Sequence, residues 1–181
     1  MRHCSQCGAP VELRVPAGDN RPRHVCSACE TVHYQNPRLI VGCIPQWEDR
    51  ILLCRRAIEP AYGRWTLPAG FLELGEGTAE GAAREAAEEA CIDVDIGPLF
   101  SLIDVPHIGQ VHMLYLATLR EPRWAAGEES LEVDLFTEDD IPWPELSFRS
   151  VRETLRHYFE DKRRGRFELH TAVLGPPTGK G

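Results

Sequence analysis

Four cysteines near the N-terminus have a spacing that suits a metal ion. Cys4 pairs with Cys7, and Cys26 pairs with Cys29, with two residues inside each pair. Two such pairs predict one tetrahedral Zn²⁺ site, in which each pair forms a tight knuckle. Four thiolates fill the coordination sphere, so the zinc would be structural. Two disulfides or redox pairs are the alternative, which the odd total of 7 cysteines and the lack of a visible export signal disfavour.

A second group of residues is acidic. Residues 73–95 hold eight acidic residues and one basic residue, Arg84. On a helix, Glu85 lies three and four positions before Glu88 and Glu89, so the three carboxylates share one face. They repel one another, and the helix dipole disfavours negative charge near the C-terminus. A divalent cation would make the arrangement favourable, and carboxylates select Mg²⁺ or Mn²⁺ over zinc. From charge alone, a solvated helix face is the alternative.

A longer pattern surrounds these acids. Gly70 is followed after five residues by Glu76, and after seven more by residues 84–90, which read REAAEEA, with aliphatic Ile92 two positions later. This spacing resembles the box of the Nudix hydrolases, and every charged position of the box is met. One position departs, because Cys91 stands where the family usually has Gly. If the left-handed turn that this Gly allows is kept, a non-Gly residue costs roughly 1–2 kcal/mol.

The resemblance extends over most of the chain. The cysteine pairs, residues 33–37 (HYQNP) and residues 65–70 (WTLPAG) are similar to the zinc-ribbon Nudix hydrolases. Residues 106–110 (PHIGQ) and 129–132 (ESLE) make the plant-type FAD/ADP-ribose pyrophosphatases the closer match. NADH pyrophosphatases carry a Ser-Gln-Pro-Trp-Pro-Phe-Pro array after the box, and residues 104–110 (DVPHIGQ) lack it. NADH or another nucleotide is therefore the alternative substrate.

The resemblance implies a Mg²⁺- or Mn²⁺-dependent hydrolysis. The substrate would be the diphosphate of FAD or ADP-ribose, and the products AMP with FMN or ribose 5-phosphate. By this resemblance Glu88 and Glu89 are the main metal ligands, and Glu85 binds metal or orients the attacking water. The Ala69 carbonyl would supply a further ligand, and Arg84 would orient a glutamate.

The other candidate residues have less defined roles. Glu76 is expected to cap or pair within the loop that precedes the helix. Some relatives place a general base or an extra ligand on a later loop or strand, for which Glu132 is the first candidate and Glu129 the second, with a surface acid as the alternative. His107 and His112 lie in a segment that could face substrate. The aromatic residues that could stack on a ring, or belong to the core, are Trp65, Phe71, Tyr34, Trp124 and Trp143.

These residues need a scaffold of strands and helices. The hydrophobic patterns predict strands at 38–47, 50–56, 65–67, 93–103, 110–119 and 131–136, and helices at 78–90 and 148–161. The first two strands should pair antiparallel, and Thr78 is the expected N-cap of the first helix. Cys43 and Cys54 lie in apolar runs and should be core residues. The interleaved order indicates an α/β or α+β fold with a mixed sheet between helices. The resemblance makes this a Nudix-type α/β/α sandwich.

The composition bounds the class of protein. The chain has 181 residues, 43% of them hydrophobic, and a net charge of −8, which suits one globular domain with a small appendage. We expect a zinc ribbon at residues 1–36, a Nudix domain at 37–165 and a partly disordered C-terminal extension at 166–181. The longest apolar run, residues 39–45, is too short for a membrane span. A cytoplasmic protein is expected.

Partners follow from charge and from the resemblance. The acidic balance disfavours bulk binding to nucleic acid or membrane, because both need positive charge. The expected partner is therefore a small nucleotide diphosphate, and zinc-ribbon relatives imply a homodimer. A different hypothesis is a module whose ribbon binds RNA or protein. A small basic surplus in residues 1–36 and the basic residues at 162–166 support it.

Overall fold

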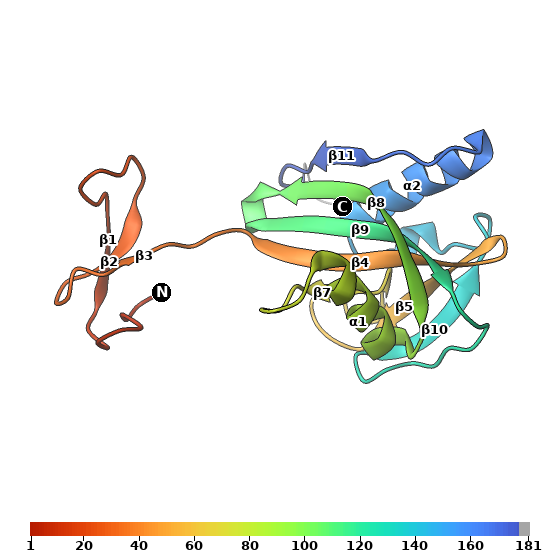
Figure 1. The fold of residues 1–181 in the computed structure, drawn as a ribbon, viewed down its shortest axis with the longest axis horizontal. Coiled ribbons are helices and arrows are strands. Elements are labelled where there is room, and N and C mark those ends of the chain that lie inside the picture. The colour runs from red at the N-terminus through yellow and green to blue at the C-terminus, as the bar shows by residue number, and fades with distance from the viewer. Residues whose placement is uncertain (178–181) are drawn as a thin grey trace. The chain divides into compact units, whose positions relative to one another are not determined.

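The N-terminal unit is a small sheet built around cysteines. The computed structural model, which describes residues 1–177, divides the chain into two compact units, Met1–Asn36 and the part from Pro37 onward. The first contains the antiparallel strands β1 (Val11–Arg14), β2 (Arg23–Cys26) and β3 (Val32–His33), in the order β1-β2-β3 (Figure 1). Its buried hydrophobic side chains are Cys4, Val25 and Cys26. So small a core cannot hold a fold by burial alone.

The second unit is built on an eight-stranded mixed sheet. Its strands are β4 (Arg38–Trp47), β5 (Arg50–Arg56), β6 (Trp65–Thr66), β7 (Ala69–Phe71), β8 (Val94–Val105), β9 (Gln110–Leu119), β10 (Ser130–Phe136) and β11 (His170–Val173). The order is β10-β5-β4-β9-β8-β11, with β6 on β5 and β7 on β4. The pairs β4–β9 and β8–β11 are parallel, and the other pairs are antiparallel.

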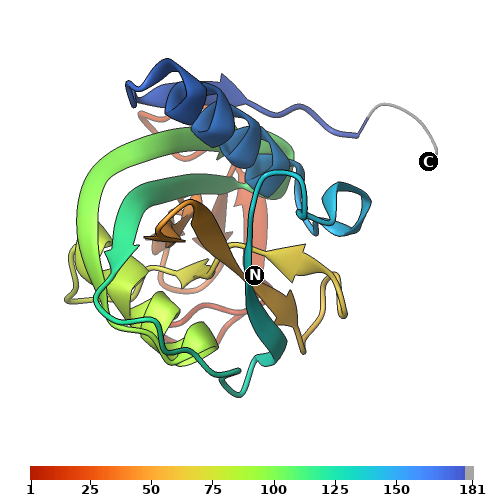
Figure 2. The same ribbon diagram turned by 90° about the vertical axis from the view of Figure 1, so that its right-hand side faces the viewer.

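Two helices cover opposite faces of this sheet. They are α1 (Thr78–Ala90) and α2 (Arg149–Arg164), and the short 3₁₀ turns are η1 (Pro106–Ile108) and η2 (Trp143–Glu145). Val41 and Cys43 of β4 pack in the same core cluster as the alanines of α1, whereas Ile44 packs with α2. Figure 2 shows the curved strands between the two helices. This arrangement confirms the predicted α/β/α fold with its mixed sheet.

Most predicted elements occur close to their expected bounds. The β4 and β5 strands pair antiparallel as predicted, and Cys43 and Cys54 are buried core residues. The prediction for Thr78 is wrong: the N-cap of α1 is Gly77, whose N–H donates to Glu80 Oε2 at 2.7 Å. The Thr78 hydroxyl instead lies 2.6 Å from the Tyr115 hydroxyl, so it ties the helix to β9.

The expected C-terminal extension contributes a strand to the sheet. Strand β11 pairs with β8, and Leu174 is buried. Asp161 of α2, also buried, accepts hydrogen bonds from the Glu168 N–H at 3.0 Å and from His170 Nε2 at 2.8 Å. Residues 178–181 of the expected disordered tail lie outside the described residues. In residues 1–177, none of the helices is both long enough and apolar enough to cross a bilayer.

Candidate metal centres and active site

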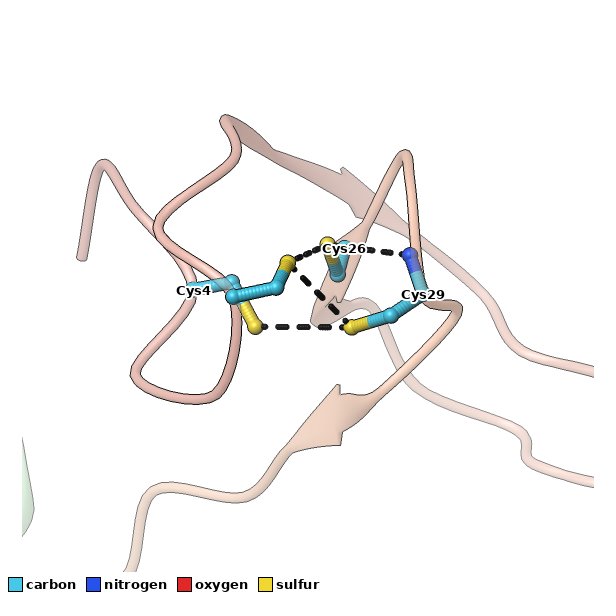
Figure 3. A group of neighbouring side chains, drawn as sticks. Cys4, Cys26 and Cys29 are labelled. Carbon is cyan, nitrogen blue, oxygen red and sulfur yellow. Dashed lines mark hydrogen bonds between the residues drawn. The ribbon is translucent and has the colours of Figure 1, made fainter.

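The N-terminal cysteines form a compact sulfur cluster. The Sγ atoms of Cys4, Cys7, Cys26 and Cys29 all lie within 4.8 Å of one another. Cys4 Sγ lies 3.7 Å from Cys29 Sγ, and Cys7 Sγ lies 3.4 Å from Cys26 Sγ (Figure 3). Backbone N–H groups of both knuckles also donate to these sulfurs. The donor set and its geometry fit a structural Zn²⁺ ion.

Hydrogen bonds lower the pKa of Cys26 and Cys29, which favours at these two residues the thiolate form that zinc requires. Thr31 Oγ1 lies 3.1 Å from Cys29 Sγ. Hydrogen bonds from Thr31 lower the pKa of Cys29 to about 6. His33 Nε2 lies 3.3 Å from Cys4 Sγ and can donate to it. A deprotonated sulfur that accepts hydrogen bonds is a preformed ligand for Zn²⁺. Thr31 and His33 were not predicted from sequence as residues that support the zinc ligands.

The acidic helix lines one large cavity in the second unit. This cavity has a volume of about 840 Å³, and all of its lining residues lie between Ile40 and Pro177. Glu85, Glu88 and Glu89 face it from α1, and Ala69 and Gly70 face it from β7. The volume suits a nucleotide-sized ligand. The structure thus brings together the three helical glutamates and the loop that precedes them.

Two of the glutamates are buried beside each other. Glu89 is 6% exposed, and its Oε2 accepts the Ala69 N–H at 3.1 Å. Burial, and then the charge of Glu85, raise the pKa of Glu89 to about 8. Glu85 is 8% exposed, and burial raises its pKa as well. Neighbouring buried carboxylates are costly without a cation, so this donor set fits a hard divalent ion.

Arg84 connects the acidic residues of helix and loop. Its guanidinium donates to Glu76 at 2.8 and 3.0 Å, to Glu85 at 2.8 Å and to Glu88 at 3.0 Å. A further bond at 3.1 Å reaches the carbonyl of Phe71. The hydrogen bonds from Arg84 lower the pKa of Glu76 to about 2. Arg84 and Glu76 therefore hold the loop against the helix, and Arg84 orients the other glutamates.

Gly70 has a packing reason to be glycine. A Cβ atom at this position would lie 2.4 Å from Glu85 Oε2 and 2.5 Å from Glu85 Oε1. Any side chain would therefore displace the Glu85 carboxylate.

Within residues 1–177, only the four cysteines bring three or more ligand atoms within 4.8 Å of one another. The carboxylates are spread around the cavity, with Glu85 and Glu88 held by Arg84.

The structure does not bring Glu132 to this cavity. Its side chain is 52% exposed and pairs with Arg55 at 3.4 Å. The register of β10 shifts between Ser130 and Glu132, next to Arg56 and Arg55 of β5. Glu129, the second candidate, lies just before the strand and lines the cavity with Glu128. The geometry therefore favours Glu129 over Glu132 for a role beside the helical glutamates.

The other candidates divide between cavity and core. His107, His112 and Phe71 line the cavity, and burial lowers the pKa of His112. Trp65, Trp124 and Trp143 pack in the hydrophobic core, and Tyr34 belongs to the ribbon, where it lies under Arg23. Many other lining residues were not identified from sequence, among them Arg56, Phe148 and Leu174. They come from strand ends and helix starts far apart in the chain, so no local motif indicates them.

Comparison with known families agrees with this architecture. The family described as "Nudix N-terminal" matches residues 2–35, and the "NUDIX domain" matches residues 36–159. The chain therefore belongs to the NUDIX domain family, with a zinc-ribbon Nudix region ahead of the domain. Divalent Mg²⁺ or Mn²⁺ is the metal that Nudix hydrolases use, and the carboxylates around the cavity suit it.

Three similar proteins are a Nudix hydrolase of known structure and two relatives that are named for their substrates. The crystal structure of a NUDIX hydrolase from Nitrosomonas europaea is 49% identical, covers 96% of this chain and 99% of its own, and has a TM-score of 0.93. The NAD-capped RNA hydrolase NudC of Vibrio vulnificus is 31% identical over 78% of this chain and 53% of that protein. The ADP-ribose pyrophosphatase of Methanocaldococcus jannaschii is 26% identical over 60% of this chain and 67% of that protein. The chain thus spans about half the length of this NudC relative.

Proposed function

We propose that the protein is a Mg²⁺-dependent pyrophosphatase that hydrolyses a diphosphate linking a nucleoside to a second organic group. ADP-ribose and FAD are the substrates we propose first. The observation that carries this proposal is the set of helical glutamates Glu85, Glu88 and Glu89 around one cavity of about 840 Å³. The matched family and the relative named for ADP-ribose also support it.

The residue types suit the chemistry of a phosphoric anhydride. A diphosphate repels an attacking water, and bound Mg²⁺ would neutralise its oxygens and acidify the water. Glu88 and Glu89 are the proposed metal ligands, with the Ala69 carbonyl as a further one. Glu85 is proposed to bind metal or orient the water, and Glu129 to accept its proton, in place of Glu132. The water oxygen then bonds to phosphorus, the bridging P–O bond breaks, and AMP leaves with a second phosphate monoester.

A second candidate substrate is NADH or the NAD cap of an RNA. The similarity to NudC proteins favours it. The array typical of NADH pyrophosphatases is absent from residues 104–110, which favours ADP-ribose or FAD instead. For capped RNA, the ribbon with its small basic surplus would be the contact that the hypothesis of an RNA-binding module requires.

A substrate panel tests the proposal. ADP-ribose, FAD, NADH, nucleoside triphosphates and a short NAD-capped RNA are incubated with the full chain, with and without Mg²⁺, and products are separated by chromatography. We expect Mg²⁺-dependent release of AMP from ADP-ribose or FAD. Faster cleavage of NADH or capped RNA would favour the second candidate. No cleavage of any compound would contradict the proposed activity.

We also propose that the protein forms a homodimer, as the resemblance to zinc-ribbon relatives implies. Light scattering on the eluting peak of a sizing column measures the mass directly. A mass twice that of the chain would support the dimer. A monomer mass at micromolar concentration would contradict it.

A further inference from the structure

The C-terminal segment, residues 166–177, contributes to the wall of the candidate active-site cavity. This segment lies beyond the matched NUDIX domain, which ends at residue 159. Its strand β11 pairs with β8 at the edge of the sheet (Figure 1). Leu174, which follows β11, is 9% exposed and lines the cavity, as does Pro177. Part of the cavity wall therefore comes from outside the matched domain.

The order of the strands places Leu174 at the opposite end of the cavity from the carboxylates. Four of the lining residues lie on consecutive strands of the sheet: Ile40 on β4, His112 on β9, Val105 on β8 and Leu174 after β11. Strand β7, whose Gly70 lies against the Glu85 carboxylate, pairs with β4. Three strand spacings, or roughly 14 Å along the sheet, separate β4 from β11. A ligand whose phosphates lie at the carboxylates would therefore reach Leu174 with its organic group.

Apolar side chains surround Leu174. It packs with Ile103 and Val105 of β8 and with Ala172. This small cluster is separate from the two larger hydrophobic cores of the second unit, so Leu174 contributes little to them. An apolar wall of this kind offers no hydrogen-bond donor to phosphate oxygens, and it suits the flat face of a ring.

Contacts on both sides of Leu174 hold the segment in one position. The Leu174 N–H donates to the Asp104 carbonyl at 2.8 Å, which continues the pairing with β8. One residue further on, the Gly175 carbonyl accepts a hydrogen bond from Arg149 Nη1 at 2.8 Å. Ahead of β11, the buried carboxylate of Asp161 accepts two hydrogen bonds from the segment. A wall that is already ordered costs little entropy when a ligand packs on it.

We propose that Leu174 packs against the purine ring of the substrate, so that the C-terminal segment selects the nucleoside that the enzyme binds. This rests on the proposed function of the cavity, and it adds a contact for the organic group rather than for the phosphates. Adenosine is the nucleoside common to ADP-ribose, FAD and NADH, which makes its purine the ring to test. The competing explanation is structural, with the segment serving only to cover the edge of β8.

Two uncleavable probes, one with a ring and one without, separate these explanations. The zinc-loaded full chain and the variants Leu174→Ala and Leu174→Val are titrated calorimetrically in Mg²⁺ with the α,β-methylene analogue of ADP and with methylenediphosphonate. We expect the wild-type protein to bind the ADP analogue more tightly. Leu174→Ala should weaken binding of the ADP analogue about tenfold and Leu174→Val about threefold, because apolar contact with the ring is lost in steps. The affinity for methylenediphosphonate should change less than about twofold.

Val173→Ala is the matched control. Val173 is the neighbouring residue, but its side chain is 69% exposed, so this variant should leave both affinities unchanged. Thermal unfolding without ligand is measured in parallel for every variant. Leu174→Val decides the outcome if Leu174→Ala does not fold, since it removes a single carbon.

Three results would overturn the proposal. One is an unchanged affinity of the Leu174 variants for the ADP analogue, and another is an equal loss of affinity for both probes, as a purely structural role predicts. The third is a wild-type protein that binds methylenediphosphonate as tightly as the ADP analogue, or binds neither. A wild-type protein that binds the ADP analogue through Leu174 but cleaves no diphosphate would contradict the proposed function alone.

Discussion

The zinc ribbon and the acidic helix present two different sets of candidate metal ligands in one chain. In the ribbon, four sulfurs lie within 4.8 Å of one another, and the buried residues are Cys4, Val25 and Cys26. The acidic helix instead packs on an extensive core, with Ala82, Ala86 and Ala90 fully buried. The ribbon therefore uses its metal in place of a core. The helix has a core that positions its carboxylates, so a metal bound there would be free to serve chemistry.

The two candidate metal sites also differ in how their ligands are arranged. Sulfurs that receive backbone hydrogen bonds are ready to bind a soft ion and leave it no open position. Arg84 instead bridges the carboxylates of Glu85 and Glu88. A hard ion such as Mg²⁺, held by only a few carboxylates, keeps several water ligands and can also contact substrate phosphates. A metal whose coordination positions are all filled by protein ligands suits a structural role, whereas a metal with open coordination positions suits catalysis. The experiments below test whether the two sites can be separated in this way.

Removing one zinc ligand should have the largest effect, confined to the ribbon. Cys26→Ser takes away a buried thiolate, and structural zinc contributes on the order of 10 kcal/mol to such small folds. We expect loss of bound zinc and of ordered NMR signals from residues 1–36. Hydrolysis should stay within about twofold, since the described residues that line the cavity lie between Ile40 and Pro177 and none belongs to the ribbon. Cys91→Ser is the control, and a collapse of activity in Cys26→Ser would show that the two sites are coupled.

Neutralising the helical carboxylates should abolish activity and spare the ribbon. Glu88→Gln and Glu89→Gln each remove a proposed metal ligand, and we expect kcat to fall about 10³-fold or more, as when a group essential to transition-state stabilisation is lost. Zinc content should not change. Glu153→Gln on α2 is the matched control because it lies on the other helix. Near-normal kcat in both variants would contradict the assignment of the cavity as a Mg²⁺ site.

Replacing the residue that connects the acids should have an intermediate effect. Arg84→Lys keeps the charge but cannot reach Glu76, Glu85 and Glu88 together, as the guanidinium does. We expect about a tenfold drop in kcat and a loss of about 1–2 kcal/mol in stability by urea unfolding. Arg120→Lys is the control, since that arginine pairs with two exposed aspartates. Equal effects of the two substitutions would argue against a positioning role for Arg84.

The stability of the Nudix domain should depend on pH in a direction set by Glu89. Its folded pKa of about 8 lies above the ordinary value of 4.5, so between these pH values the folded state binds more protons than the unfolded state. The contribution of Glu89 should therefore be present at low pH and be lost as pH rises toward 8. Urea unfolding from pH 5 to pH 8 without added divalent ion measures this. Glu89→Gln should flatten the slope, and added Mg²⁺ should restore stability at high pH; a slope unchanged by Glu89→Gln would contradict the shift.

Sequence reasoning was strongest where a pattern is local. The spacing of the cysteines predicted the sulfur cluster, and the periodicity of residues 78–90 predicted the shared face of the glutamates. It was weakest where contacts join distant segments. Strand β11 was missed because its four residues are too few to show a periodic pattern. The choice between Glu132 and Glu129 is of this kind: Glu129 lines the cavity and Glu132 does not, and a register shift lies between Ser130 and Glu132 of β10.

Substitution of Cys91, a strained residue at the end of the acidic helix, should have the smallest effect. Cys91 occupies the left-handed region, with φ 53° and ψ 37°, and its N–H donates to the Ala87 carbonyl at 3.0 Å. The helix therefore keeps the turn that glycine usually makes, and a side chain there is strained. Cys91→Gly should stabilise the Nudix domain by about 0.5–1 kcal/mol, because relief of 1–2 kcal/mol of strain is partly offset by the greater freedom of glycine in the unfolded chain. Cys91→Ala keeps the strain and is the control. The affinity of the ribbon for zinc should be the same in the wild-type protein and in both variants, since this strain belongs only to the helix. If Cys91→Ala stabilised the domain as much as Cys91→Gly, the thiol and not the backbone strain would be the cause.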